Sequence, residues 1–195
     1  MSKLIDITRT VQDAPLYPGS SPIRVERVVD MKQGALFNVS KITTGSHIGT
    51  HADAGCHFLA DNNTGIDKME LHRYYGPCCV VTVPEKSLIT RAMLEGKIDN
   101  CQRLVINSSG SSYLAKDGAE YIVEKGVLTV VTDAWSIGPM DNEPEIHTII
   151  MSAGLAVVEN VVLDGVADGE YILSAFPIKI GGCDGAPVRA VLIAT

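Results

Sequence analysis

Long apolar runs, basic clusters and an excess of positive charge are all missing from this chain of 195 residues. Without a run of about eighteen apolar residues, no segment is a candidate for a membrane-spanning helix. Lys and Arg total 16 against 23 Asp and Glu, a net charge of −7, and no basic patch is available for a nucleic-acid backbone. We therefore expect a protein that binds neither membranes nor nucleic acids.

The five cysteines include no C-x-x-C pair, and Cys78 and Cys79 are adjacent, which is a poor basis for a disulfide framework or a zinc knuckle. Residues 1–6 carry Lys3 and Asp6 where a secretory signal would have an apolar stretch. These features predict reduced thiols and a cytoplasmic location.

Several catalytic motifs are also absent. The chain has no P-loop and no G-x-G-x-x-G, so nucleotide cofactors have no support. Its serine-rich stretch 108–112 lacks the G-x-S-x-G elbow of serine hydrolases. Cys56 beside His57 is a weak candidate nucleophile, because adjacent residues of an extended strand point apart.

What is present is a strand-rich pattern in a chain long enough for one domain, which we expect to span residues 1–195. Short runs rich in Val and Ile, bounded by turn residues, predict strands. Helical spacing predicts three helices, so we expect a mixed α/β fold without a regular βαβ repeat. The predicted strands are Leu4–Ile7, Ile23–Val29, Cys78–Val83, Leu104–Asn107, Val127–Thr132, Leu155–Val158, Tyr171–Phe176 and Val188–Ile193, and the predicted helices are Thr90–Gly96, Asp117–Lys125 and Asn142–Ala153.

Three of the five histidines lie within eleven residues: His47, His51 and His57, with Asp53 among them. In an extended chain these even intervals place all four side chains on one side, and the alternation of Leu36–Ile42 predicts a half-buried strand leading into them. Full extension would separate His47 from Asp53 by about 20 Å, too far for one ion. Gly49 and Gly55 supply the bends that a compact site requires.

Imidazole and carboxylate without thiolate suit zinc or manganese. We therefore predict a metal site in the segment from His47 to His57. His147 lies in a predicted helix, and Glu159 follows a buried-looking apolar run where a charge is costly unless it is paired or bound to metal. From spacing alone each of these two is more often structural, and His72 has no partner pattern. The proline-rich loop 15–22 is either a rigid surface turn or part of the site.

The segment His47-Ile-Gly-Thr-His-Ala-Asp-Ala-Gly-Cys-His-Phe58 resembles the signature of the cyclase-family metal-dependent hydrolases, H-x-G-T-H-x-D-x-P-x-H-F, the group that includes bacterial kynurenine formamidases and isatin hydrolases. Gly55 replaces the proline of that pattern. The opening 5–8 with 17–19, the pair His147 and Glu159, and the block 177–190 are similar too, so the resemblance spans nearly the whole chain.

The resemblance implies a swivelling β/β/α-type fold and a homodimer or homotetramer. It implies metal-ligand roles for His47, His51 and Asp53, with His147 and Glu159 completing a site for one or two ions. It also implies that His57 is the general acid/base rather than a permanent ligand.

One departure bears on the substrate. Family members often have threonine-glycine-tryptophan where this chain has Asn107-Ser108-Ser109. If that missing aromatic holds an aryl substrate, kynurenine-type compounds are disfavoured here, unless Tyr17, Phe58 or Tyr113 compensates.

The expected reaction is metal-dependent hydrolysis of an amide or cyclic amide, with a divalent ion activating water and His57 moving a proton to the leaving nitrogen. Two alternatives remain open from the sequence. One is a lyase or isomerase that uses the same pocket, and the other is a non-catalytic metal- or ligand-binding module.

Overall fold

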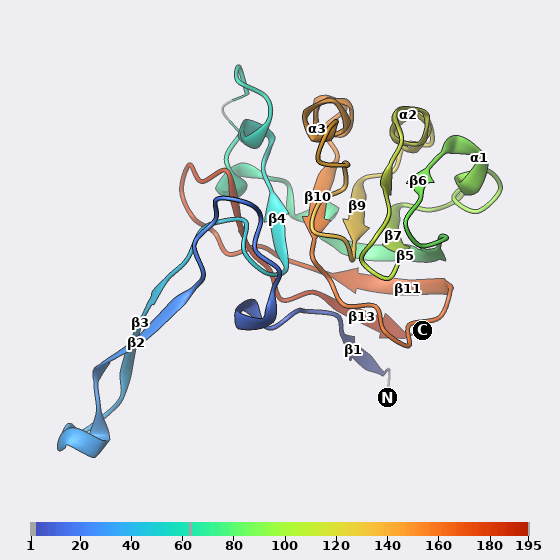
Figure 1. Ribbon diagram of the computed structural model, residues 1–195. Coiled ribbons are helices and arrows are strands. Elements are labelled where there is room, and N and C mark those ends of the chain that lie inside the picture. Colours follow the sequence, from blue (N-terminus) through green and yellow to red (C-terminus); the bar gives the residue numbers. More distant parts are fainter. Residues whose placement is uncertain (1–2, 63, 195) are drawn as a thin grey trace.

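A curled nine-stranded sheet dominates the computed structural model, which describes residues 3–62 and 64–194 (Figure 1). The strand order is β1-β13-β11-β5-β7-β9-β10-β4-β12. The bounds are β1 Leu4–Asp6, β4 His51–Asp53, β5 Tyr75–Thr82, β7 Arg103–Asn107, β9 Thr129–Thr132, β10 Ala156–Glu159, β11 Gly169–Ser174, β12 Gly185–Pro187 and β13 Val191–Ala194.

The central strands β5, β7, β9 and β10 are parallel, and antiparallel strands flank them on both sides. Helices α1 (Arg91–Leu94), α2 (Lys116–Glu124) and α3 (Glu143–Ser152) lie together along one face of the parallel strands (Figure 1). A short two-stranded sheet, β6 (Leu88–Ile89) with β8 (Tyr113–Leu114), lies beside them. The predicted mixed, strand-rich α/β fold is confirmed.

Two hydrophobic clusters use the two faces of the central strands. Val105, Val131 and Val158 belong to a cluster that also takes residues of β11, β13 and β4. Leu104 and Val130, one residue earlier on their strands, belong to a cluster shared with the three helices. Successive side chains on a strand point to opposite faces, and strands buried on both faces read as unbroken apolar runs. The central strands were predicted from the sequence because they have this unbroken apolar pattern.

The eight predicted strands and three predicted helices all have counterparts, with ends that coincide or differ by up to three residues. The strands that prediction missed are short: β4 and β12 have three residues each, and β6 and β8 have two. Runs this short carry no periodicity, so their neighbours decide their conformation. None of the helices in the described ranges is long and apolar enough to cross a membrane.

A hairpin arm formed by β2 (Arg24–Val29) and β3 (Val39–Thr43) projects away from the body of the protein (Figure 1). All five residues of β3 are exposed, and Leu36 at the tip is 91% exposed. The prediction of a half-buried strand over Leu36–Ile42 is therefore wrong about burial. The alternation indicates extended backbone, but the arm has no second layer to cover either face.

The cysteines also depart from expectation. Cys79 on β5 and Cys101, just before β7, form a disulfide, whereas the sequence predicted five reduced thiols. Cys79 pairs in register with Leu104, so the partner strand carries Cys101 close to it. Sequence spacing gave no sign of this pairing because it depends on strand register. Cys56, Cys78 and Cys183 are free.

Candidate metal centre

The His-rich segment is a turn, a short strand and a second turn. His47 lies in the first turn, β4 spans His51–Asp53, and a single 3-10 turn spans Gly55–His57. Gly49 has a φ of 68°, the left-handed conformation that glycine adopts readily, and it bends the chain as predicted. Only His51 and Asp53 share a strand, so the expectation that even spacing places side chains on one side holds for those two. His47 and His57 lie in turns, and the turns bring them to the same place.

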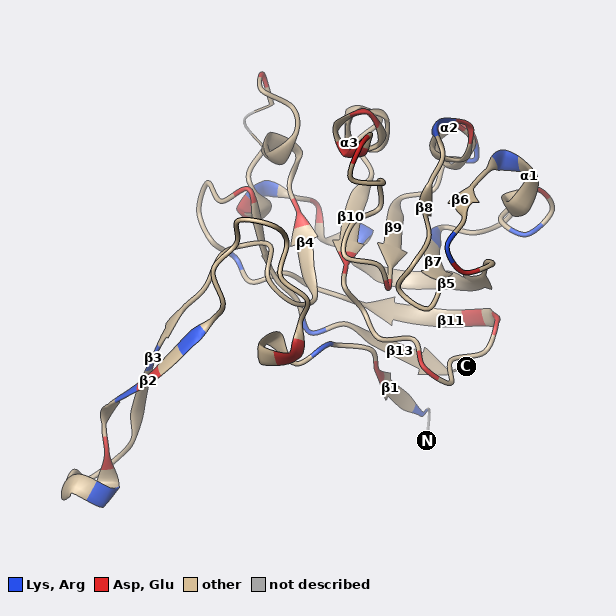
Figure 2. Ribbon diagram, viewed as in Figure 1, with Lys and Arg blue, Asp and Glu red and all other residues tan. Residues whose placement is uncertain are grey.

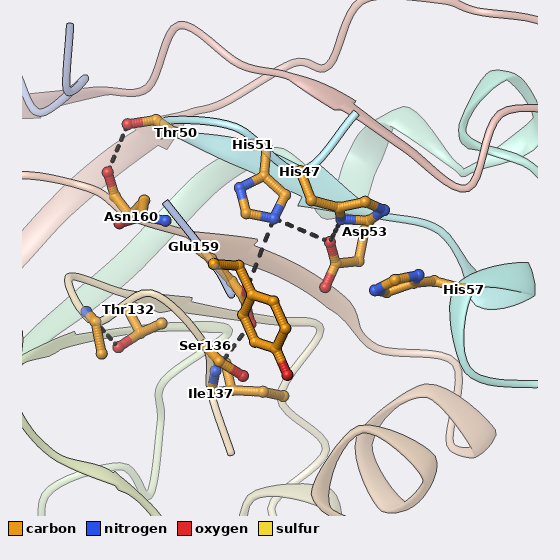
Figure 3. Close-up of polar contacts among 12 residues, drawn as sticks. His47, Thr50, His51, Asp53, His57, Thr132, Ser136, Ile137, Glu159 and Asn160 are labelled. Atoms are coloured by element: carbon orange, nitrogen blue, oxygen red, sulfur yellow. Dashed lines mark hydrogen bonds and ion pairs between the residues drawn. The ribbon is translucent and has the colours of Figure 1, made fainter. Parts of the chain in front are cut away.

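Strand pairing brings a third side chain to the same face. β4 lies between β10 and β12, and His51 is opposite Glu159 in the β4–β10 register. Directly opposed residues of an antiparallel pair project to one face of the sheet, as do residues two apart on one strand. Side chains of His51, Asp53 and Glu159 therefore converge (Figure 3). Glu159 is only 4% exposed, and this convergence gives its buried carboxylate polar partners.

The carboxylate of Asp53 lies close to three histidines. Its Oδ1 lies 2.9 Å from Nδ1 of His47 and 3.4 Å from Nε2 of His51. Its Oδ2 lies 3.6 Å from Nε2 of His147 on α3. The structure thus brings three of the predicted ligands, His47, His51 and His147, to the carboxylate of a fourth, Asp53. Figure 3 labels His47 and His51 beside Asp53.

Glu159 completes the group from the adjacent strand. Its Oε1 lies 3.2 Å from Nε2 of His147 and accepts a 2.8 Å hydrogen bond from the backbone N–H of Ile137. Its Oε2 lies 3.5 Å from Nε2 of His51. The helix-then-strand arrangement expected for His147 and Glu159 is observed, and all five predicted ligands fall in one cluster.

Two backbone carbonyls fix the orientation of the buried histidines. Nδ1 of His51 donates to the carbonyl of Gly49 at 2.8 Å, and Nδ1 of His147 donates to the carbonyl of Glu143 at 3.0 Å. A carbonyl only accepts, so each Nδ1 carries a proton, and Nε2 of each ring faces the carboxylates, where it donates when the ring is protonated and offers a lone pair when the ring is neutral. Such outer hydrogen bonds are typical of histidines that bind metal.

The buried carboxylates of Asp53 and Glu159 need positive charge beside them when they are ionised. Burial opposes ionisation of Asp53, but hydrogen bonds from His147, His47 and His51 outweigh it and hold its pKa well below the usual range. Burial disfavours protonated His147, yet Asp53 and Glu159 raise its pKa to about 10. Burial and the charge of Asp53 raise the pKa of Glu159. The two buried carboxylates and the Nε2 atoms that face them therefore need either protons or a cation between them.

A divalent cation fits this donor set. Within the described residues, two groups of three have ligand atoms within 4.8 Å of one another: His47, Asp53 and His57, and also His51, Asp53 and Glu159. Imidazole nitrogen and carboxylate oxygen are ligands that zinc and manganese accept. Asp53 belongs to both groups, and a shared carboxylate is how a site for two neighbouring ions is built.

His57 stands at the edge of the cluster. Its ring stacks on His47, with centroids 3.9 Å apart and planes inclined by 20°, and its Nδ1 lies 3.7 Å from Oδ2 of Asp184. Burial lowers the pKa of His57, and the charges of His47 and His147 act in the same direction, although Asp53 and Asp184 oppose them. A histidine that is neutral near pH 7 is suited to accept and return a proton.

Asp184 is a site residue that the sequence analysis did not assign. Its Oδ2 lies 3.2 Å from Nε2 of His47, and its Oδ1 accepts a 2.9 Å hydrogen bond from the Ser46 hydroxyl. It precedes β12, the strand that pairs with β4, which explains its position. The only signal for it in the sequence was its place in the C-terminal block of the family resemblance.

A cavity of about 260 Å³ opens onto the cluster. Ligand pockets usually measure about 300–1,000 Å³, so this cavity suits a small molecule. Its lining residues are Pro15, Tyr17, Ser20, His47, His51, His57, Phe58, Trp135, Glu143, His147, Glu159 and Asn160. The proline-rich loop 15–22 therefore belongs to the site rather than to a remote surface turn.

Aromatic rings form much of the cavity wall. Tyr17 and Trp135 have ring centroids 5.8 Å apart, and Phe58 stacks on His147 at 4.1 Å. Of the three aromatics considered as compensating for the family tryptophan, Tyr17 and Phe58 line the cavity, whereas Tyr113 is not among the lining residues and accepts a hydrogen bond from the indole of Trp135. Trp135, the only tryptophan, was missed because it lies in an irregular loop after β9.

Comparison with known proteins places this geometry in a family. Residues 5–139 match the sequence model described as "Cyclase: Putative cyclase". The chain belongs to the cyclase family. Among its cyclase-family relatives, kynurenine formamidases from Bacillus cereus and Bacillus anthracis are each 33% identical over 204 residues, covering 98% of this chain and 97% of theirs.

Solved structures agree on the fold. A potential metal-dependent hydrolase with cyclase activity has a TM-score of 0.86 at 23% identity and covers 100% of this chain and 99% of its own. Isatin hydrolase A from Labrenzia aggregata has a TM-score of 0.85 at 18% identity and covers 100% and 94%. At these identities the likeness shows the fold alone. The family predicted from the sequence is confirmed.

Proposed function

We propose that this cyclase-family protein hydrolyses an aryl formamide or a related cyclic amide, with His57 as the general acid/base. The curated relatives named kynurenine formamidase support the broader class, a metal-dependent amidohydrolase acting on a small molecule. The observation that carries the proposal is the sharing of Asp53 by two potential metal-binding groups that face one aromatic cavity. We propose that residues 1–195 act as one such hydrolase domain.

His47, His51, Asp53, His147 and Glu159 would hold one or two divalent ions, zinc or manganese. A bound ion of this kind supplies Lewis acidity, which makes water a nucleophile near neutral pH and polarises a carbonyl oxygen. The buried carboxylates and the carbonyl-anchored histidines provide a rigid donor set for it, so little reorganisation accompanies binding.

The chain's own residues account for the proton movement. Nε2 of His57 has no hydrogen-bond partner among the described residues and lies beside the cavity, while Asp184 faces its Nδ1. His57 accepts the proton that water loses as its oxygen adds to the carbonyl carbon, and returns it to the nitrogen as the C–N bond breaks. Proton transfer of this kind contributes roughly 10²–10⁴ in rate.

The aromatic walls would orient a flat substrate. Tyr17 and Trp135 lie on one side of the cavity, and Phe58 fixes the rings of His147 and His57 by stacking on the first and meeting the second edge-on at 4.4 Å. A ring inserted between these residues replaces water at apolar surface, which favours binding. This arrangement supports an aryl amide over an aliphatic one.

The test combines elemental analysis of protein purified without chelator with a panel of formamides, lactams and simple esters assayed in ¹⁸O-labelled water. We expect a divalent ion, turnover of aryl formamides and one labelled oxygen in the acid product. Turnover without label would indicate the lyase or isomerase alternative. A tightly held metal with no turnover across the panel would indicate a binding module and contradict the proposal.

We also propose a homodimer or homotetramer, on the basis of the β2–β3 arm. Phe37 is 60% exposed and Ile42 is 63% exposed, and a two-stranded hairpin is marginally stable on its own in water. A second copy that covers these apolar side chains would stabilise the arm. Light scattering should give a dimer or tetramer, and Phe37→Ser with Ile42→Ser should give a smaller species; an unchanged mass in the variant would contradict this role.

We propose the cytoplasm as the location. Cys56 and Cys183 are partly exposed free thiols near the site, a state that a reducing compartment maintains. The Cys79–Cys101 disulfide is the opposing observation, because such bonds are rare in that compartment. Cell fractionation with thiol trapping tests this, and recovery of the protein outside the cytoplasm with both thiols oxidised would contradict it.

A further inference from the structure

A single acidic side chain in the cavity wall is not used by the metal centre. Glu143 begins α3, and its backbone carbonyl anchors His147 through the 3.0 Å hydrogen bond described above. Its carboxylate Oε2 accepts a 2.9 Å hydrogen bond from the hydroxyl of Tyr17, across the cavity mouth. The side chain is therefore held at a fixed point on the wall, one helical turn from a proposed ligand.

Outside the cluster of histidines with Glu159, Glu143 is the only acidic or basic side chain among the described residues that line the cavity. The twelve lining residues include two carboxylates, Glu143 and Glu159, and no Lys or Arg. Glu159 is occupied by His51, His147 and the N–H of Ile137. Acidic residues mark the start of α3 in Figure 2. In the part of the chain that the structure describes, Glu143 makes no ion pair, whereas Glu145 on the same helix pairs with Lys116 at 2.7 Å.

We propose that Glu143, supported by Tyr17, is a specificity-determining residue that selects aryl amides carrying a protonated amine and disfavours those carrying a carboxylate. This inference rests on the proposed amidohydrolase function and specifies its substrate class. Tyr17 occupies Oε2, so Oε1 is available to a substrate ammonium group. A substrate carboxylate placed against Glu143 would meet this negative charge, and no Lys or Arg of the cavity lining offsets it there.

The expected size of the effect follows from the chemistry of the contact. Hydrogen bonds between charged groups are roughly twice as strong as neutral ones. Tyr17 is 39% exposed, so solvent and salt screen the interaction at the cavity mouth. We expect about a tenfold difference in kcat/KM between cationic and anionic substrates, which shrinks as ionic strength rises.

The experiment uses the metal-loaded protein and formanilides with an aminomethyl, methyl or carboxylate group at the meta or para position. Wild type should prefer the aminomethyl compound to the carboxylate by about tenfold, with the methyl compound between them. Glu143→Gln should reduce this preference to within about threefold. The change should be in the ratio of kcat/KM values, and metal content and circular dichroism should match wild type.

Glu145→Gln is the matched control, because it removes the same charge from the same helical turn. The Glu145 carboxylate bonds Lys116 and Asn142 and does not line the cavity. We expect it to leave the preference unchanged. If both variants lost the preference for the aminomethyl compound equally, the total negative charge of the protein would be selecting the substrate. That result would overturn the role of Glu143.

Two other results separate this inference from the proposed function. Hydrolysis of all three formanilides by wild type at similar kcat/KM would overturn the inference and leave the amidohydrolase function standing. No hydrolysis of any of them, nor of other amides, by metal-loaded protein would refute the function on which the inference depends.

Discussion

Nδ1–H of His51 donates a hydrogen bond to the carbonyl of Gly49 at 2.8 Å, so the residue that bends the chain also sets the orientation of the imidazole. Gly49 has a φ of 68°, and a Cβ there would lie 3.2 Å from Cα of Val11. Gly49→Ala should therefore strain the bend, tilt His51 and lower metal affinity at least tenfold. A competition assay with a chromogenic chelator measures this affinity.

Gly96 provides the control for backbone strain. It has a φ of 74°, but a Cβ there would meet nothing within 4 Å, and it lies in the turn after α1, far from the site in sequence. Gly96→Ala should cost about 1–2 kcal/mol of stability, as a left-handed alanine does, and leave metal affinity unchanged. Equal loss of metal in both variants would contradict a local role for Gly49.

His51 and His57 should give separable losses. His51→Ala removes a nitrogen that faces both Asp53 and Glu159, so metal content and activity should fall together. His57→Ala should retain metal and lose roughly 10²–10⁴ in kcat, the contribution of a general acid/base. Elemental analysis and steady-state kinetics with formanilide distinguish the two.

His57 also belongs to one of the two potential ligand groups, with His47 and Asp53. If His57→Ala lost one of two ions in step with its activity, then His57 would be a ligand rather than the acid/base. Retention of full turnover by this variant would contradict both roles.

The sequence predicted this site unevenly, for identifiable reasons. His51 and Asp53 are two apart on a strand, so their spacing alone placed them on one face. Glu159 reached that face through the β4–β10 register, which spacing cannot give, and its assignment depended on the family resemblance. Asp184 and Trp135 lie in loops without periodicity, so nothing in the local pattern indicated that they join the site.

The fold shows the same division. Buried parallel strands such as Arg103–Asn107 and Thr129–Thr132 were predicted because burial on both faces leaves an apolar run. The strand at 39–43 was predicted as half-buried because alternation normally indicates one covered face. Its exposure depends on what lies opposite the arm, which the sequence of the arm does not encode. The Cys79–Cys101 bond depends likewise on the pairing of two strands.

The buried thiol of Cys78 should make stability depend on pH in the alkaline range. Burial raises its pKa from 9.0 to about 12, partly offset by Arg103. Because the folded-state pKa is the higher one, the contribution is fully present below pH 9 and is lost as pH rises toward 12. Urea midpoints measured from pH 8 to 11 should fall less steeply in Cys78→Ala than in wild type.

Cys183→Ala serves as the control, since that thiol is partly exposed. Its urea midpoints should follow the wild-type slope. Parallel slopes for wild type and Cys78→Ala would show that the alkaline loss arises elsewhere.

The Cys79–Cys101 disulfide should stabilise the pairing of β5 with β7. It joins residues 22 apart, and closing a loop of that size in the unfolded chain is worth about 3 kcal/mol. Reduction, or the double variant Cys79→Ala with Cys101→Ala, should lower the free energy of unfolding by about this amount. Guanidinium unfolding with and without reductant measures it. Alkylation of all five cysteines in denatured, unreduced protein would show that the bond does not form.

The position of Asp53 on a strand flanked by two others has a consequence for how the protein matures. The donor groups converge only when β4 has paired with β10, and contacts across this pairing, such as Thr50 with Asn160, join residues 110 apart in the chain. Long-range pairing of this kind forms slowly, after local elements. A newly synthesised chain would therefore be unable to bind the metal ion until β10 has paired with β4. Metal binding would then be a late step that stabilises the completed sheet, and it would not initiate folding.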